Sequence, residues 1–270
     1  MSDESPKDVN GPLPRKGRSL TVPRSKKRPS PNLALPLKIA AHGSILMLGI
    51  LGVIAVFAHI DRLPEGDKPW GEARLDEPIG RFSYDHIAAL RSDPVACYAA
   101  LDGSEMDYTP VEPRAPRPNA SCGWDAAVQV TQSNLDYATP EPEVASCALA
   151  AALYVWEREV VRPAALAHLG SDAVEVVHYG TYACRRVNNS QAGSWSEHAG
   201  ANAIDVAGFR LADGREIGVR HWDVDDERAA FLREVRDGSC PLFRGVLGPE
   251  YNAAHDDHFH LDMGEWEICS

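Results

Sequence analysis

Two short segments in the last third of the chain carry residue types that bind metal ions. In the first, His198 stands seven residues before Asp205. The second, residues 255–260, reads HDDHFH and contains two histidines separated by one residue, His258 and His260. Because imidazole and carboxylate groups are both common zinc ligands, we interpret the two segments as halves of one zinc site.

The number of ligands indicates what such a site would do. A His and an Asp from the first segment and one His from the second make three protein ligands, so a fourth tetrahedral position stays open. Structural zinc sites are usually closed by four protein ligands, whereas catalytic sites keep one position for water. Because zinc-bound water becomes a nucleophile near neutral pH, the pattern favours hydrolysis.

The elements around these residues explain how they would meet. Residues 203–209 are predicted to form a strand around Asp205, and His198 lies in the loop before it. Side chains two apart on a strand face the same side. We therefore expect His258 and His260 to share one face, one binding the metal and the other beside it, while Phe259 points into the core.

The remaining pattern beyond residue 80 mixes helices with strands. We expect helices over 82–101, from about Pro142 through Glu159 with a break at Pro163, and over 225–237. We expect strands at 128–130, at 174–179 continuing toward Arg185, at 216–221 after a turn at 212–215, and at 258–262 as the final strand, with a proline-rich loop at 109–119. This order predicts an α+β domain with a small central antiparallel sheet and flanking helices.

Charge is distributed unevenly along the chain. Of 27 Lys and Arg and 39 Asp and Glu residues, nine basic and three acidic ones precede residue 39, and none lies in 39–60. Residues 61–270 therefore hold 27 − 9 = 18 basic and 39 − 3 = 36 acidic residues, a net charge of −18. So acidic a body argues against nucleic-acid binding, because phosphate groups need a cationic surface.

Residues 39–60 form an apolar run of 22 residues without a charged side chain. A helix of this length can cross a hydrocarbon layer of about 30 Å. The basic residues before it should stay in the cytoplasm, which places the rest of the chain in the periplasm. The alternative is a signal peptide cleaved after Val56-Phe57-Ala58, but the long basic head favours a retained, single-pass anchor in the inner membrane.

We divide the chain at these boundaries. The expected parts are a disordered basic head at 1–38, a transmembrane helix at 39–60, a linker at 61–80 and the zinc domain at 81–270. All six cysteines lie in the last part, as expected of three disulfides in an oxidising compartment. Of the possible pairings we favour Cys97–Cys122, Cys147–Cys184 and Cys240–Cys269.

The metal-binding motifs resemble those of known bacterial families. Ser-x-His, Ala-x-Asp and His-x-His, at 196–198, 203–205 and 258–260, resemble the LAS metallopeptidases, which include lysostaphin-type endopeptidases, D-alanyl-D-alanine carboxypeptidases and the murein endopeptidase MepA. Residues from about 80 to 270 look more like the bacterial extensin-like C-terminal domain family, because Tyr182–Arg185 and Leu247–Asn252 also have its character.

The resemblance implies roles for individual residues. The implied zinc ligands are His198, Asp205 and His260, the catalytic carboxylate is Asp257, the functional histidines are His258 and His255, and the basic residue that binds substrate or stabilises the oxyanion is Arg185. Asp257 or His258 would accept the proton of the attacking water and return it to the leaving amine. Glu197 is an alternative base. Many relatives have glycine three residues after the first ligand, where this chain has Ala201.

Together these observations predict a membrane-anchored periplasmic zinc peptidase that hydrolyses peptide bonds of peptidoglycan stem peptides or cross-links. One alternative is a non-catalytic peptidoglycan-binding or scaffold module that retains the zinc site. Another is a zinc hydrolase of a different amide or ester. Inactive relatives usually lose a ligand or the base, so the presence of Asp257 and His258 favours an enzyme. The sequence indicates peptidoglycan and a membrane as partners, and no particular protein.

Overall fold

The computed structural model describes residues 34–115, 122–137 and 143–270, with side chains from residue 42 onward. Contacts within the chain divide it into two compact units, Met1–Ala55 and Val56–Ser270. The first described element is helix α1 (Ala34–Ile60), which covers the predicted span at 39–60. Its part from His42 to Ile60 is long and apolar enough to cross a membrane. The predicted basic head lies, up to residue 33, outside the described residues.

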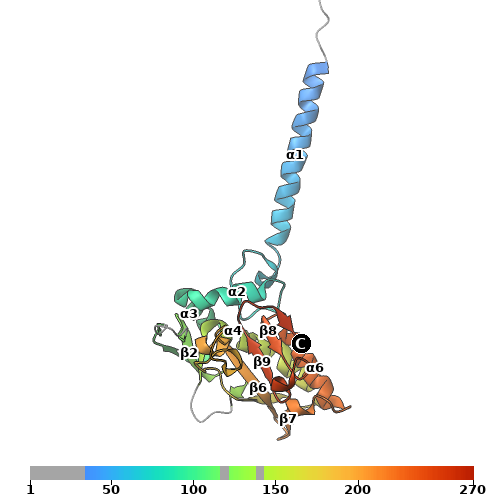
Figure 1. Ribbon diagram of the computed structural model, residues 1–270. Helices are drawn as coiled ribbons and strands as arrows, with labels where there is room; N and C mark the ends of the chain where they lie inside the picture. Colours follow the sequence, from blue (N-terminus) through green and yellow to red (C-terminus); the bar gives the residue numbers. More distant parts are fainter. Residues whose placement is uncertain (1–33, 116–121, 138–142) are drawn as a thin grey trace, which may run out of the picture. The chain divides into compact units, whose positions relative to one another are not determined.

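The second unit is α+β and is built on a seven-stranded sheet (Figure 1). Its strands, in spatial order, are β10 (Ile268–Cys269), β8 (Gly245–Leu247), β9 (Phe259–Asp262), β6 (Ala203–Leu211), β5 (Ala173–His178) and β3 (Asp136–Tyr137), with β7 (Glu216–Gly218) also paired to β6. The prediction of an antiparallel sheet is wrong at both ends of this order. There β10 runs parallel to β8 and β3 runs parallel to β5, so the sheet is mixed.

A smaller antiparallel sheet contains β1 (Asp107–Val111), β2 (Ala127–Gln132) and β4 (Val144–Ser146). The strand predicted at 128–130 is confirmed within β2. The loop predicted over 109–119 is wrong in its first residues, which belong to β1; Pro110 is tolerated there because β1 is an edge strand. Residues 116–119 of that prediction lie outside the described residues.

The helices of this unit differ from the predicted ones mainly at their ends. They are α2 (Ser83–Ala89), α3 (Pro94–Asp102), α4 (Cys147–Trp156), a π-helical turn (Glu157–Val161), α5 (Arg162–Leu169) and α6 (Glu227–Ser239). The single helix predicted over 82–101 is divided because Asp93 caps a new helix, accepting hydrogen bonds from Val95 N and Ala96 N. The helix predicted over 225–237 is confirmed as α6, shifted by two residues.

The prediction around Pro142–Glu159 needs two corrections. Residue 142 lies outside the described residues, and the helix begins only at Cys147 because Val144–Ser146 form β4, with Ser146 accepting a hydrogen bond from Leu149 N. Pro163 does not break the helix. It occupies the first turn of α5, directly after the π turn, and the helical backbone continues through this junction.

Two predicted strand boundaries are also wrong. β5 ends at His178 and does not continue toward Arg185, since Gly180 has a φ of 119°, which is incompatible with a regular strand. The predicted final strand, β9, is followed by β10. The hairpin after 212–215 is confirmed: β7 pairs antiparallel with β6, although only Glu216–Gly218 of the predicted 216–221 are strand.

The core lies between the large sheet and the helices. Every residue of α4 is buried, and the ring of Trp156 at its end lies 5.8 Å from the ring of Phe209 on β6. Phe209 in turn contacts Phe231 of α6, with 5.2 Å between ring centroids. Residues 61–80, which we expected to be a linker, contribute Leu75, which is 2% exposed, to the same core.

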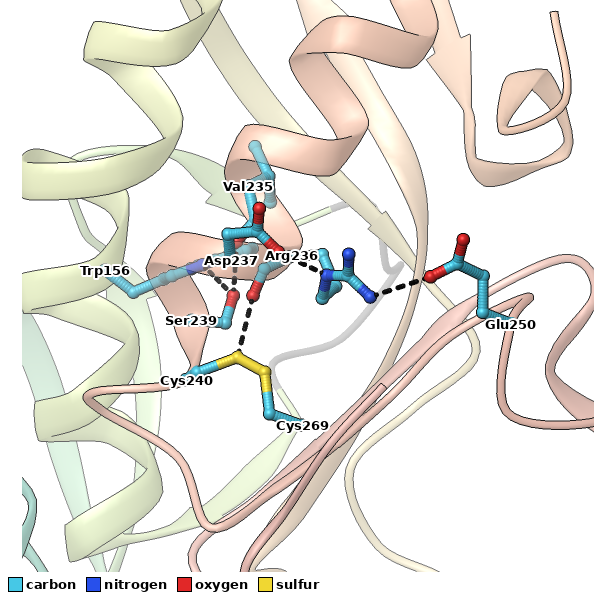
Figure 2. The surroundings of a disulfide bond; sticks show 8 residues. All are labelled: Trp156, Val235, Arg236, Asp237, Ser239, Cys240, Glu250 and Cys269. Carbon is cyan, nitrogen blue, oxygen red and sulfur yellow. Dashed lines mark hydrogen bonds and ion pairs between the residues drawn. A yellow bond between two sulfur atoms is a disulfide. The ribbon is translucent and has the colours of Figure 1, made fainter.

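Three disulfides close the fold: Cys97–Cys147, Cys122–Cys184 and Cys240–Cys269. Only the last was predicted correctly. The predictions for Cys97–Cys122 and Cys147–Cys184 are wrong because α3 packs beside the start of α4, which brings Cys97 to Cys147. Cys240–Cys269 ties the end of α6 to β10, beside the buried hydrogen bond from Trp156 Nε1 to Ser239 Oγ at 2.8 Å (Figure 2).

Candidate metal centre

Asp205 and His260 are brought together by strand pairing. Asp205 on β6 lies directly opposite His260 on β9, and directly opposite residues on antiparallel strands lie close on one face. The gap between His260 Nδ1 and Asp205 Oδ1 is 2.9 Å. A bulge follows in β6: His178 lies opposite Val206 but Val177 opposite Gly208, so Ala207 is an extra residue and Phe209 returns to the core side.

His198 reaches the same point from a short 3-10 helix, Glu197–Gly200, just before β6. Ser196 caps this turn by accepting a hydrogen bond from His198 N. His198 is 3% exposed, and its Nε2 lies 3.2 Å from Asp205 Oδ1 and 3.3 Å from His260 Nδ1. The structure thus brings His198, Asp205 and His260 together as a set of three possible metal ligands.

The second nitrogen of each histidine is already engaged. His198 Nδ1 lies 3.0 Å from the carbonyl oxygen of Thr181, which can only accept, so Nδ1 carries the hydrogen. His260 Nε2 lies 3.0 Å from Oδ2 of Asp262, which also accepts. In neutral rings the lone pairs of His198 Nε2 and His260 Nδ1 therefore face the Asp205 carboxylate. Metal-bound histidines are held by such partners.

These groups fit a zinc ion. Three ligand atoms about 2.1 Å from a tetrahedral zinc lie roughly 3.4 Å from one another. The three separations, 3.2, 3.3 and 2.9 Å, are close to this value. Two nitrogen lone pairs and a carboxylate oxygen have no hydrogen to share among them, so a cation is the partner that satisfies all three. The donor set of two imidazoles and one carboxylate leaves a coordination position open, as in catalytic zinc sites.

The electrostatics of the cluster point the same way. Burial alone would raise the pKa of Asp205, but hydrogen bonds from His198 and His260 lower it well below its ordinary range. Burial would lower the pKa of His260, yet its hydrogen bonds to Asp205 and Asp262 raise it to about 9, so without a metal ion the ring holds a proton that a bound cation would displace. The cluster therefore stabilises an anionic Asp205 surrounded by positive charge, which a bound cation also supplies.

His258 and Asp257 form a second pair beside the three ligands. His258 Nδ1 donates to Asp257 Oδ1 at 2.9 Å, which leaves the Nε2 lone pair directed toward the cluster, 3.7 Å from Asp205 Oδ1. Asp257 also accepts from the Tyr179 hydroxyl at 3.3 Å and from Arg220 Nη2 at 2.5 Å. The His258 hydrogen bond, with the charge of Arg220, lowers the pKa of Asp257 despite partial burial.

His255 lies next to this pair. Its ring centroid is 5.2 Å from that of His258 and 6.2 Å from that of His260. Its Nδ1 lies 2.9 Å from Oδ1 of Asn252. Burial, followed by the charges of His258 and His260, lowers the pKa of His255 to about 4, so the ring is neutral at neutral pH.

Two sequence candidates stand apart from the cluster. Within the described residues, no ion pair or hydrogen bond joins the Arg185 guanidinium to the site residues. The Glu197 carboxylate is held by Asn202 Nδ2 at 2.7 Å and by Arg91 Nη1 at 3.4 Å, so it is directed away from the metal ligands. Arg220, not Arg185, is the guanidinium in contact with the site.

The turn after His198 has the left-handed backbone that glycine adopts most easily. Ala201 occupies it with φ 52° and ψ 32°, fully buried, and its carbonyl accepts a hydrogen bond from Ser146 N at 2.7 Å. Alanine is strained in this conformation. This chain therefore forms a left-handed turn here without a glycine at the position.

Four contributors to the site were missed from the sequence: the Thr181 carbonyl, Tyr179, Arg220 and Asp262. Asp262 had a usable signal, since it stands two residues after His260 and must share its face of β9. Tyr179 and Arg220 reach Asp257 from the end of β5 and from the 3-10 turn after β7, and no local pattern pairs such distant segments.

A comparison with protein families matches residues 95–270 to the family described as extensin-like protein C-terminus. The chain belongs to the extensin-like C-terminal family. The match spans all the residues of the candidate metal centre. No curated protein and no solved structure matches the chain.

Proposed function

We propose that this protein is a membrane-anchored periplasmic zinc peptidase that hydrolyses peptide bonds of peptidoglycan. The observation that carries the proposal is that His198, Asp205 and His260 converge on one point, which the free nitrogen of His258 also faces. The second ring nitrogen of His198 and that of His260 are already engaged in hydrogen bonds. A structural zinc site has no need of an adjacent base. The position of His258, where such a base would act, supports a LAS-type hydrolytic site.

A zinc ion held by these three residues would polarise the scissile carbonyl and lower the pKa of a bound water. His258 Nε2, which lies 3.7 Å from Asp205 Oδ1, would accept a proton from the attacking water and return it to the leaving amine. Asp257 fixes the ring by accepting from Nδ1, and stabilises the charge that the ring acquires. Asp257 thus acts through His258, and Tyr179 and Arg220 hold Asp257 in place.

The proposed location rests on the apolar helix and on the disulfides. The His42–Ile60 part of α1 has the length and composition of a membrane span, and three disulfides form beyond it. Disulfides persist in oxidising compartments such as the periplasm. Peptidoglycan is the abundant peptide polymer of that compartment, so it is the proposed substrate.

The variant His258→Ala separates catalysis from metal binding. Because His258 is not among the three ligands, the variant should keep its zinc while the rate of peptide hydrolysis falls about 100- to 10,000-fold. His168→Ala, at a surface histidine paired with Glu234 on α6, is the matched control and should change neither quantity. Zinc content by mass spectrometry and released peptidoglycan fragments give the two readouts. Undiminished hydrolysis in His258→Ala would remove His258 from the mechanism.

A further inference from the structure

Two arginines stacked on aromatic rings lie beside the metal-binding loop. The guanidinium of Arg114 lies 5.5 Å from the ring of Trp124 and 5.3 Å from that of Tyr182. The guanidinium of Arg186 lies 4.4 Å from the ring of Trp195. In both stacks an isolated antiparallel bridge holds the arginine opposite its tryptophan. We call these five residues the Arg–aromatic surface.

The described residues do not neutralise the charge of these two arginines. Among the described residues of this acidic unit, ten other arginines form ion pairs with Asp or Glu. Within the described part of the chain, Arg114 and Arg186 form none. Stacking on an aromatic ring holds a guanidinium in place. Arg186 Nη1 also donates to the carbonyl oxygen of Gly193, a neutral acceptor, which leaves the other N–H donors of that guanidinium for another partner. The exposed carboxylates of Glu112 and Asp125 lie close by in sequence and pair with neither arginine.

The two stacks lie close to the metal centre along the chain. The disulfide Cys122–Cys184 joins the two segments that carry Trp124 and Tyr182. Ala183 N donates to the carbonyl oxygen of His198 at 3.0 Å, and Trp195 stands three residues before His198. Three residues of extended chain span at most about 10 Å. Trp195 of the second stack therefore lies at most about 10 Å along the chain from His198.

We propose that the Arg–aromatic surface binds the carboxylate-bearing saccharide–peptide chain of peptidoglycan, outside the bond that is cleaved. The proposal rests on the function proposed above, and deepens it by naming where the polymer is held. Guanidinium groups bind carboxylates through paired hydrogen bonds, and aromatic rings pack against the apolar faces of sugars. Tyr182 and Arg186 are four residues apart, at most about 14 Å, so both stacks can engage one extended chain.

Charge complementarity resolves how an acidic protein holds an anionic polymer. Residues 61–270 carry a net charge of 18 − 36 = −18, which repels the polymer over most of the surface. The unpaired guanidinium groups beside the metal centre attract the carboxylates of the polymer at that place alone. The same stacks could hold single-stranded nucleic acid, but a phosphate backbone needs many cationic contacts and the body is strongly anionic.

The test is co-sedimentation of the full chain, in mild detergent, with insoluble peptidoglycan. The His258→Ala chain is used so that hydrolysis does not consume the polymer. Adding Arg114→Gln and Arg186→Gln should weaken binding about tenfold or more and reduce its salt dependence, because two charge-assisted contacts are lost. Arg233→Gln is the matched control. Arg233 lies on α6 and is also stacked on a tryptophan, Trp222, so this variant should bind peptidoglycan as the parent does.

A second variant distinguishes a loss of binding from a loss of folding. Trp195→Ala keeps both charges and should also weaken binding, while zinc content and the near-ultraviolet circular dichroism stay unchanged. Peptidoglycan whose carboxylates have been amidated should bind the parent as weakly as intact polymer binds the double variant. Unchanged binding in the double variant, absent binding by the parent, or tighter binding of a single-stranded oligonucleotide would each overturn the proposal. Fragment release by the wild-type chain is measured separately, so failure of catalysis is distinguishable from failure of this surface.

Discussion

At the scale of the residue, the two candidate histidine ligands present different nitrogens to the proposed metal position. His198 uses Nε2 because the Thr181 carbonyl holds Nδ1, and His260 uses Nδ1 because Asp262 holds Nε2. In each ring, a partner that can only accept a hydrogen bond determines which nitrogen carries the hydrogen. The orientation of both rings is therefore fixed before any metal arrives, which lowers the entropy lost on binding.

Asp262→Asn tests this arrangement. The amide is nearly isosteric but is a weaker acceptor than the carboxylate, so His260 loses a charged partner and zinc affinity should fall about 10- to 100-fold. Competition with a chromophoric chelator measures the affinity. Asp213→Asn, in the exposed turn before β7, should leave it unchanged. Equal affinities for the Asp262 and Asp213 variants would show that Asp262 does not support the ligand.

The residues with recognisable side-chain chemistry were the ones that sequence could predict. His198, Asp205, His258 and His260 stand at spacings that a loop and two strands explain, and the structure brings them together. The Thr181 contact uses a backbone carbonyl, which carries no signature of its own. Arg185 was selected by family resemblance. The arginine that contacts the site is Arg220, and its position depends on how the turn after β7 folds back.

At the scale of the element, periodicity predicted β2, β6, β9 and α6 because each has a clear apolar pattern. It did not predict the π turn at Glu157–Val161, since that turn lies inside one continuous helical pattern. It also failed for the pairings of Cys97 and Cys147. Those cysteines meet because α3 packs on α4, and helix packing is a tertiary property that no local pattern encodes.

Glu157, at the start of the π turn, should make stability depend on pH. It is completely buried and accepts hydrogen bonds from Ser133, Leu135 and Tyr137; burial raises its pKa from 4.5 to about 7. Because the folded pKa is the higher one, its contribution to stability is complete below about pH 4.5 and is lost as pH rises toward 7. The loss is on the order of 3 kcal/mol.

Glu157→Gln should remove that part of the pH dependence. Urea unfolding, followed by tryptophan fluorescence at pH 5 and pH 7.5, measures the free energy of unfolding of wild type and variant. The wild type should lose more stability between the two pH values than the variant does. Glu159→Gln, at the neighbour paired with Arg158 near the surface, is the control and should follow the wild type. A variant that follows the wild-type curve would refute the assignment.

The disulfides should differ in their effect on the metal centre. Replacing both cysteines of Cys122–Cys184 by serine should lower the free energy of unfolding by about 2–4 kcal/mol. It should also weaken zinc binding, because Cys184 adjoins Ala183, which donates to the His198 carbonyl. The same replacement at Cys240–Cys269, between α6 and β10, should reduce stability while leaving zinc affinity intact. Equal zinc affinities in the two double variants would contradict this account.

At the scale of the whole molecule, a helix with the composition of a membrane span precedes an acidic, disulfide-closed domain. The proposed anchor predicts that the full chain stays with membranes after high-salt and alkaline washing. Deleting residues 42–60 should release it, because that part supplies the apolar length needed to cross. Fractionation and immunoblotting measure this. A soluble mature chain that begins near residue 59 would favour the cleaved signal peptide instead.

The most direct test of the central claim combines metal content with peptidoglycan hydrolysis. The full chain, purified with its disulfides intact, is assayed for zinc and then incubated with purified peptidoglycan, and released fragments are identified by mass spectrometry. We predict about one zinc per chain, held by three protein ligands, and new peptide fragments, with both lost in His260→Ala. A chain that binds no zinc under these conditions would contradict the account.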